Sequence, residues 1–320
     1  MNSIKDFTLK LDELEFVGRD LSRPESVIAE KDGTLWVSDT RGIATRIDPD
    51  GTQNLLGDVG HEPNGLAMDA EGNLYNANIG DGNVYKMYRD GSYEVFLDQI
   101  DGKPLGAPNF VFIDSKDRIW ISISTGELDY MVSVSSLRPD GYIILIDESG
   151  PRIVGDGIFI TNEVRMDAEE KYLYAAETMK GRILRFPVNN DGSLGEKEVF
   201  GPVSLGYGAF VDGFTFDAEG NIWVTTLFRN GLMIITPDGE AHTVFEDPVD
   251  NALKELVDKV EAGTVTFQDF RNCAGPRLQL LASLTFAGPD LKTVYMGSLE
   301  MPHLLTFRSP IPGLPMRHWK

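Results

Sequence analysis

The chain has 320 residues, of which 42% are hydrophobic and 25% are charged, as is typical of a soluble globular protein. Its net charge is −21, and so large an acidic excess disfavours binding to nucleic acid or to an anionic membrane surface. The single cysteine, Cys273, excludes an intrachain disulfide framework and a cysteine-based zinc cluster.

The amino-terminal segment MNSIKDFTLKLDELEF predicts no export signal, because acidic residues come early and no apolar core follows. No run of about 18 apolar residues occurs, so we expect no membrane span. The default location is therefore cytoplasmic. Residues 14–21, with the sequence LEFVGRDL, resemble the outer strands that occur later in the chain.

A sequence motif of about 15 residues is repeated six times from residue 25 onward. Each copy has a short β-like run, a turn rich in acidic residues or glycine, and a second run around an aromatic residue. The aromatic residues are Trp36, Tyr75, Trp120, Tyr174, Trp223 and Tyr295. Because a second hairpin follows each copy, every unit holds four antiparallel strands. The repeat predicts an all-β fold, a six-bladed β-propeller in one domain spanning 1–320.

Three segments depart from the repeat. Residues 14–21 should add the outer strand to the last blade and so close the ring. The stretch 248–280 predicts a short helical insertion before that blade, since Leu253, Leu256, Val257 and Val260 are spaced as on one helix face. The stretch 124–141 forms a long loop within the third blade.

The first residues of the six copies form a polar column. They are Glu25, Asn64, Asn109, Asn162, Asp212 and Ala282. First strands line the axis of a propeller, so these residues should meet at one end of it. Two carboxylates and three amides suit a hard divalent cation, and a donor set of oxygen alone disfavours zinc and copper. The alternative is that each residue only caps a turn.

These residues also carry a family resemblance, which covers essentially the whole chain. Its most specific pieces are the runs RPESV from Arg23, NFVFID from Asn109, TNEV from Thr161 and VDGFTFDAEGNIWV from Val211. With them the chain resembles the gluconolactonase / senescence-marker-protein / luciferin-regenerating-enzyme family of six-bladed propellers. Most members hydrolyse lactones, and some relatives hydrolyse organophosphates. The resemblance implies a divalent metal, usually Ca²⁺, with Zn²⁺, Mn²⁺ or Mg²⁺ accepted by some members.

The resemblance assigns roles to the column. Glu25, Asn162 and Asp212 match the metal ligands, Asn109 matches a residue close to the metal or the substrate, and Asn64 resembles a substrate-facing position. One departure is Ala107, because the sugar-lactone branch typically has an arginine there. Residues 124–141 and the turn at Leu227 and Phe228 add apolar side chains near the channel mouth. We therefore expect a less polar lactone or ester than a sugar lactone.

The predicted function is metal-dependent hydrolysis of a lactone or ester, with Asp212 as general base or nucleophile. His61, Glu127 and His303 are further candidates for the substrate site, although each also fits a surface or packing role. Two alternatives stay open: an organophosphate or phosphoester hydrolase of the same fold, and a non-enzymatic binding propeller. We expect a small-molecule substrate and neither a nucleic-acid nor a membrane partner, and the sequence does not predict the oligomeric state.

Overall fold

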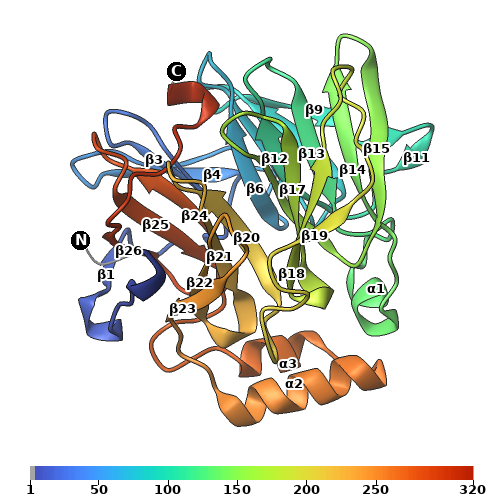
Figure 1. The fold of residues 1–320 in the computed structure, drawn as a ribbon. Helices are drawn as coiled ribbons and strands as arrows, with labels where there is room; N and C mark the ends of the chain where they lie inside the picture. Colours follow the sequence, from blue (N-terminus) through green and yellow to red (C-terminus); the bar gives the residue numbers. More distant parts are fainter. Residues whose placement is uncertain (1–3, 320) are drawn as a thin grey trace.

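The computed structural model describes residues 4–319, so residues 1–3 and 320 of the expected domain lie outside the described part. Six four-stranded antiparallel sheets follow one another along the chain (Figure 1). Each sheet pairs its strands in chain order, except the last, to which the amino-terminal strand adds. The prediction of a six-bladed, all-β propeller is confirmed.

The first three blades hold the following strands. Blade one comprises β2 (Val27–Ala29), β3 (Leu35–Ser38), β4 (Ala44–Ile47) and β5 (Gln53–Leu56). Blade two comprises β6 (Pro63–Met68), β7 (Leu74–Asn78), β8 (Asn83–Met87) and β9 (Tyr93–Leu97). Blade three comprises β12 (Pro108–Ile113), β13 (Ile119–Ile123), β14 (Gly141–Asp147) and β15 (Gly150–Ile158). A two-stranded hairpin precedes blade three, formed by β10 (Gln99–Ile100) and β11 (Lys103–Pro104).

The last three blades repeat the pattern. Blade four comprises β16 (Thr161–Met166), β17 (Tyr172–Glu177), β18 (Arg182–Pro187) and β19 (Glu198–Phe200). Blade five comprises β20 (Val211–Phe216), β21 (Ile222–Thr226), β22 (Gly231–Ile235) and β23 (Ala241–Phe245). Blade six comprises β24 (Leu281–Ala287), β25 (Thr293–Ser298), β26 (Leu304–Arg308) and β1 (Glu15–Val17).

The ring closes as the sequence predicts. Strand β1 pairs antiparallel with β26, with Phe16 opposite Leu305, so the last blade takes its outer strand from the start of the chain. Each first strand contacts the first strands of the two neighbouring blades all the way round, from β2 through β24 and back to β2. The first strands therefore line the central axis.

Six clusters of apolar side chains lie between neighbouring blades, one for each pair, and a seventh packs around the helices. Trp36, Trp120 and Trp223, three of the aromatic residues that mark the repeat, are almost fully buried in these clusters. The indole N–H groups of Trp120 and Trp223 donate to the carboxylates of Asp114 and Asp217, which also accept hydrogen bonds from the backbone of the hairpin turn. These aspartates are structural, because they join each turn to the ring that fills the gap between blades.

Three helices gather at one end of the propeller, while the carboxyl-terminal segment lies at the other end (Figure 1). They are α1 (Met131–Ser136), α2 (Asp250–Ala262) and α3 (Phe267–Asn272). The last two form the predicted insertion before blade six, and α2 buries Leu253, Leu256 and Val260. Helix α1 was not predicted and lies within 124–141. Among residues 4–319, no helix has the length and apolar character needed to cross a bilayer.

Candidate functional site

The polar column lies where the first strands are irregular. In blades two to six the pairing between first and second strands shifts register at the column residue, for example between Pro108 and Phe110 around Asn109. Glu25 comes just before β2. A bulge bends the strand and changes the direction of a side chain. The irregular starts of the strands therefore direct these side chains toward the axis.

Five column residues line one cavity of about 90 Å³, which we call the inner cavity. They are Glu25, Asn64, Asn109, Asn162 and Asp212, and all five are buried. Apolar side chains form most of the remaining wall, namely Ile79, Val134, Ile160, Met179, Leu227, Phe228, Phe270 and Leu299. The structure thus gathers the predicted metal-site residues in a small chamber with largely apolar walls.

Several oxygens of this cavity are buried without a hydrogen-bond partner. They are Glu25 Oε2, Asn109 Oδ1 and Asn162 Oδ1. The amide of Asn162 donates to Asp212 Oδ1, so these two side chains lie in contact. Unpaired buried oxygens are costly unless a ligand satisfies them. Within residues 4–319 no three His, Cys, Asp or Glu side chains form a metal cluster. The donors that fit a hard cation here are thus two carboxylates and amide oxygens.

The two carboxylates have strongly perturbed acidities. Burial raises the pKa of Asp212 to about 7, and the neighbouring charge of Glu163 adds to the effect. Burial also raises the pKa of Glu25 well above its usual value, with the charge of Asp212 as the next cause. Both shifts arise chiefly from burial in a poorly hydrated chamber, with a nearby carboxylate as the next cause in each case, and a bound cation would oppose them.

Arg23 also lines the inner cavity, and the sequence analysis did not assign it a role. Its Nη2 donates to Asn64 Oδ1 at 2.9 Å, and its Nη1 donates to the carbonyl oxygen of Pro63 at 3.2 Å. The Asn64 amide in turn donates to the carbonyl of Asn109 at 3.1 Å. Both ends of the Asn64 side chain are therefore engaged with protein. In the sequence, Arg23 could have been identified as a candidate site residue from its position two residues before Glu25.

A second, outer cavity of about 420 Å³ adjoins the inner one. The two share the lining residues Arg23, Tyr130, Phe270 and Leu299, which we call the neck. The outer cavity is more polar, since Ser22, Thr40, Glu62, Arg271 and Glu300 also line it. Tyr130 packs edge-on against Phe267 with ring centroids 5.5 Å apart. Tyr130, which directly precedes α1, and Phe270 of α3 thus supply two of the four neck residues.

The other candidate residues lie farther out. His61 is exposed and lines the outer cavity. Glu127 is exposed and accepts a hydrogen bond from Arg138 at 3.1 Å. His303 packs against Phe16 of the outermost strand of blade six, with ring centroids 4.4 Å apart. Of the three, only His61 lines either chamber as far as residues 4–319 are concerned.

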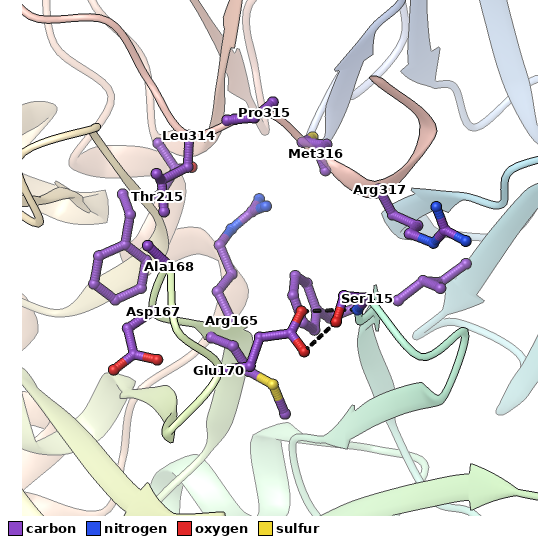
Figure 2. Close-up of a pocket in the computed structure, with 14 residues that line it drawn as sticks. Ser115, Arg165, Asp167, Ala168, Glu170, Thr215, Leu314, Pro315, Met316 and Arg317 are labelled. Carbon is purple, nitrogen blue, oxygen red and sulfur yellow. Dashed lines mark hydrogen bonds between the residues drawn. The ribbon is translucent and has the colours of Figure 1, made fainter. Parts of the chain in front are cut away.

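Another cavity, of about 230 Å³, lies at the opposite end of the axis (Figure 2). The same first strands reach it with their last residues, including Ile113 of β12, Met166 of β16 and Phe216 of β20. The carboxyl-terminal segment 314–317 forms one side of it. Figure 2 shows the Arg165 side chain extending into this space. We call it the far cavity.

Polar groups of the far cavity are largely paired with protein. Glu170 accepts hydrogen bonds from the backbone N–H and the hydroxyl of Ser115, at 2.7 and 2.6 Å. Arg317 pairs with Asp117 through two nitrogens, at 2.8 and 3.0 Å. The far cavity is larger than the inner cavity and smaller than the outer one, and these polar groups already have partners.

A buried ion pair lies between the two cavities. Glu163 Oε2 accepts hydrogen bonds from Nε and Nη2 of Arg165, at 3.1 and 3.0 Å. Both side chains are buried, and the Arg165 guanidinium also lies over the ring of Phe110. Glu163 follows Asn162 directly and affects the acidity of Asp212, whereas Arg165 lines the far cavity. The pair therefore separates the two ends of the axis.

Comparison with known proteins shows the family to which this chain belongs. Residues 24–254 match the family described as "SMP-30/Gluconolactonase/LRE-like region". This match covers more than half of the chain, and the protein belongs to that family. It includes the first five blades and the start of α2.

Similar proteins agree with this placement. A 6-deoxy-6-sulfogluconolactonase of Pseudomonas putida is 22% identical over 196 residues, which are 61% of this chain and 56% of that protein. The chain thus spans little more than half the length of this curated relative. A gluconolactonase structure from Xanthomonas campestris superposes with a TM-score of 0.68 at 18% identity, covering 92% of this chain and 88% of that one. A calcium-binding protein, regucalcin, from Agrobacterium tumefaciens gives 0.68 at 16% identity, covering 95% and 98%.

Proposed function

We propose that the protein is a metal-dependent hydrolase of lactones or related esters, with a substrate less polar than a sugar lactone. Its family and its similarity to a sulfogluconolactonase support the general class. The observation that carries the proposal is the set of unpaired buried oxygens on Glu25, Asn109 and Asn162 beside Asp212. Such a set suits a cation held against a reacting carbonyl.

Glu25, Asn162 and Asp212 would hold the metal, with Asn109 beside them. When bound, a divalent cation polarises a carbonyl oxygen and makes a nearby water more acidic. Calcium is the favoured ion because the donors are carboxylate and amide oxygens, and because a fold relative is described as calcium-binding. Zn²⁺, Mn²⁺ and Mg²⁺ are the other ions to test.

Side chains of the protein would provide the general base, exclude bulk water and position the other groups of the site. Asp212 is the proposed general base for an attacking water, since it is the cavity carboxylate held by a neighbouring amide. The apolar wall excludes bulk water and favours compact substrates with few hydroxyl groups. Asn64 acts by fixing Arg23 and the Asn109 backbone.

Elemental analysis followed by a substrate panel tests this proposal. The purified protein should contain about one divalent cation per chain in the inner cavity. It should hydrolyse a γ- or δ-lactone or an aryl ester faster than an organophosphate, and a chelator should abolish the activity. Restoring calcium should restore turnover. Protein that binds no metal and hydrolyses none of these compounds contradicts the proposal, and faster organophosphate hydrolysis supports the alternative chemistry.

A further inference from the structure

The neck between the two chambers holds a fixed positive charge. Arg23 is the basic side chain that lines the inner cavity within residues 4–319. The backbone φ angle of Arg23 is 51°, which lies in the left-handed region that residues other than glycine seldom adopt. Its guanidinium is held from one side by the Pro63 carbonyl and Asn64. Sequence and packing thus fix a strained residue at the entrance to the reacting chamber.

Two hydrogen bonds do not satisfy a guanidinium. Arginine has five N–H donors, and the two bonds to Pro63 and Asn64 use one on Nη1 and one on Nη2. The remaining donors make no hydrogen bond to residues 4–319, so they can serve a group within the neck. A planar guanidinium presents such donors in pairs, which matches the two oxygens of a carboxylate.

The charges around the inner cavity point to an anion. Glu25 and Asp212 together balance one divalent cation. Glu163 and Arg165 balance each other as a buried ion pair. Among the residues that line the inner cavity, Arg23 then leaves one positive charge in excess with the cation bound, whereas Glu62 and the Arg271–Glu300 ion pair lie in the outer cavity. In a chamber with apolar walls this excess favours a ligand with one negative charge.

We propose that Arg23 is a specificity-determining residue that selects, among lactones with few hydroxyl groups on an otherwise apolar ring, those with a single anionic substituent close to the reacting carbonyl. This inference rests on the proposed function. The carbonyl would enter the inner cavity while the substituent stays at the neck beside Arg23, and Phe270 and Leu299 would contact the apolar faces of the ring. Arg23 precedes Glu25 by two residues as Ala107 precedes Asn109, so blade one carries an arginine at the repeat position where the family resemblance leads one to expect one in blade three.

A matched pair of substrates tests this inference. One is γ-butyrolactone with a carboxylate on the carbon next to the ring oxygen, and the other is its primary amide, which has the same shape without the charge. In Arg23→Met, kcat/KM for the carboxylate should fall by about 10- to 100-fold, as expected for loss of a charged hydrogen bond. The amide should lose less than about threefold.

Arg271→Met is the control variant, because it removes the same charge from the exposed rim of the outer cavity. It should leave the preference for the carboxylate within about twofold of the wild type, since exposed charges are well screened. Equal losses on both substrates in Arg23→Met would overturn the inference. So would a loss of preference in Arg271→Met as large as that in Arg23→Met.

A binding measurement separates this inference from the proposed function. Tetrahydrofuran carboxylate and its amide lack the lactone carbonyl, and calorimetry can measure their binding to the calcium-loaded protein. The wild type should bind the carboxylate at least about 10-fold more tightly, and Arg23→Met should lose that preference. If no lactone is hydrolysed, the proposed function fails but this binding result still decides the role of Arg23. Equal binding of the carboxylate and the amide by the wild type would overturn the inference that Arg23 selects an anionic substituent.

Discussion

The two ends of the central axis are built from the same strands and differ in how their polar groups are satisfied. Residues of β12, β16 and β20 reach the inner cavity at their starts and the far cavity at their ends. Buried oxygens of Glu25, Asn109 and Asn162 have no partner at the first end. At the other end Glu170 and Arg317 are paired with protein groups.

This difference shows why the size of a single cavity is a weaker guide to the site than the state of its polar groups. The far cavity is about 230 Å³, and the inner one is about 90 Å³ with the outer cavity of about 420 Å³ beside it. A folded protein rarely leaves buried oxygens unpaired, because each costs the free energy of its lost hydration. Unpaired oxygens in an enclosed chamber therefore indicate a missing ligand more strongly than a larger hollow whose side chains already have partners.

Replacing one aspartate at each end is the strongest test of this comparison. Asp212→Asn keeps the shape of the side chain and should lower kcat/KM by about 1000-fold, because it removes both the proposed base and the negative charge of a metal ligand. Asp167→Asn is the matched control beside the far cavity, where Asp167 accepts a hydrogen bond from the backbone of Lys171. It should keep kcat/KM within about threefold of the wild type.

Steady-state kinetics on the best lactone of the panel, together with thermal unfolding, would measure both variants. Comparable losses of activity in the two variants, at unchanged stability, would show that the ends of the axis are functionally alike. Full activity in Asp212→Asn would remove Asp212 from the mechanism.

Most of the fold could be predicted because the repeat is local. Turn residues and the aromatic positions, such as Trp120, mark hairpins without any knowledge of distant contacts. Strand β1 was found because its sequence resembles other outer strands. Helix α1 was missed, since its six residues from Met131 to Ser136 are too few to show a helical period, and they pack on helix α2 far along the chain.

The candidate site was predictable only where it followed the repeat. The column residues share a register, and the structure brings five of them into one cavity. Arg23 precedes the column by two residues, so its contact with Asn64 depends on how blades one and two lie side by side. Glu127 and His303 lie in loops, and no periodicity states how far a loop residue lies from the axis.

The buried ion pair between the two ends offers the next test. Arg165→Met should lower the free energy of unfolding by about 3 kcal/mol or more, because Glu163 stays buried and loses its cation. The double variant Glu163→Gln with Arg165→Met should recover more than half of this loss, since it leaves no unpaired charge. Urea unfolding would measure both. A double variant as unstable as the single one would show that packing over Phe110, and not charge, sets the cost.

Metal removal should affect stability in a way that depends on pH. Without a cation the pKa of Asp212 is raised from 3.8 to about 7, so the folded state favours the protonated acid. The stability of the chelated protein should therefore fall as pH rises across that interval. A bound cation stabilises the ionised form of Asp212. At a free concentration 100 times its Kd, the cation should add about 2.7 kcal/mol to the free energy of unfolding.

Thermal unfolding of chelated and calcium-loaded protein at several values of pH would check this. The difference in Tm between the two forms should grow from acidic to neutral pH, because protons compete with the cation at low pH. Asp212→Asn should reduce this growth, since its amide does not titrate. A difference in Tm that is constant across the range would contradict a metal site built on Asp212.

The smallest effect is expected at the rim of the far cavity. Arg317 and Asp117 form an ion pair whose side chains are 22% and 59% exposed, so water and salt screen it. Arg317→Ala should lower the free energy of unfolding by about 1 kcal/mol or less, and leave both kcat/KM and calcium content unchanged. Chemical denaturation at low and high salt would measure it. Because the carboxyl-terminal segment is also held by the hydrogen bond from Trp319 to the Ala29 carbonyl, it should stay in place without this ion pair. A fall in kcat/KM at unchanged stability would instead mean that the far cavity communicates with the inner one through Arg165.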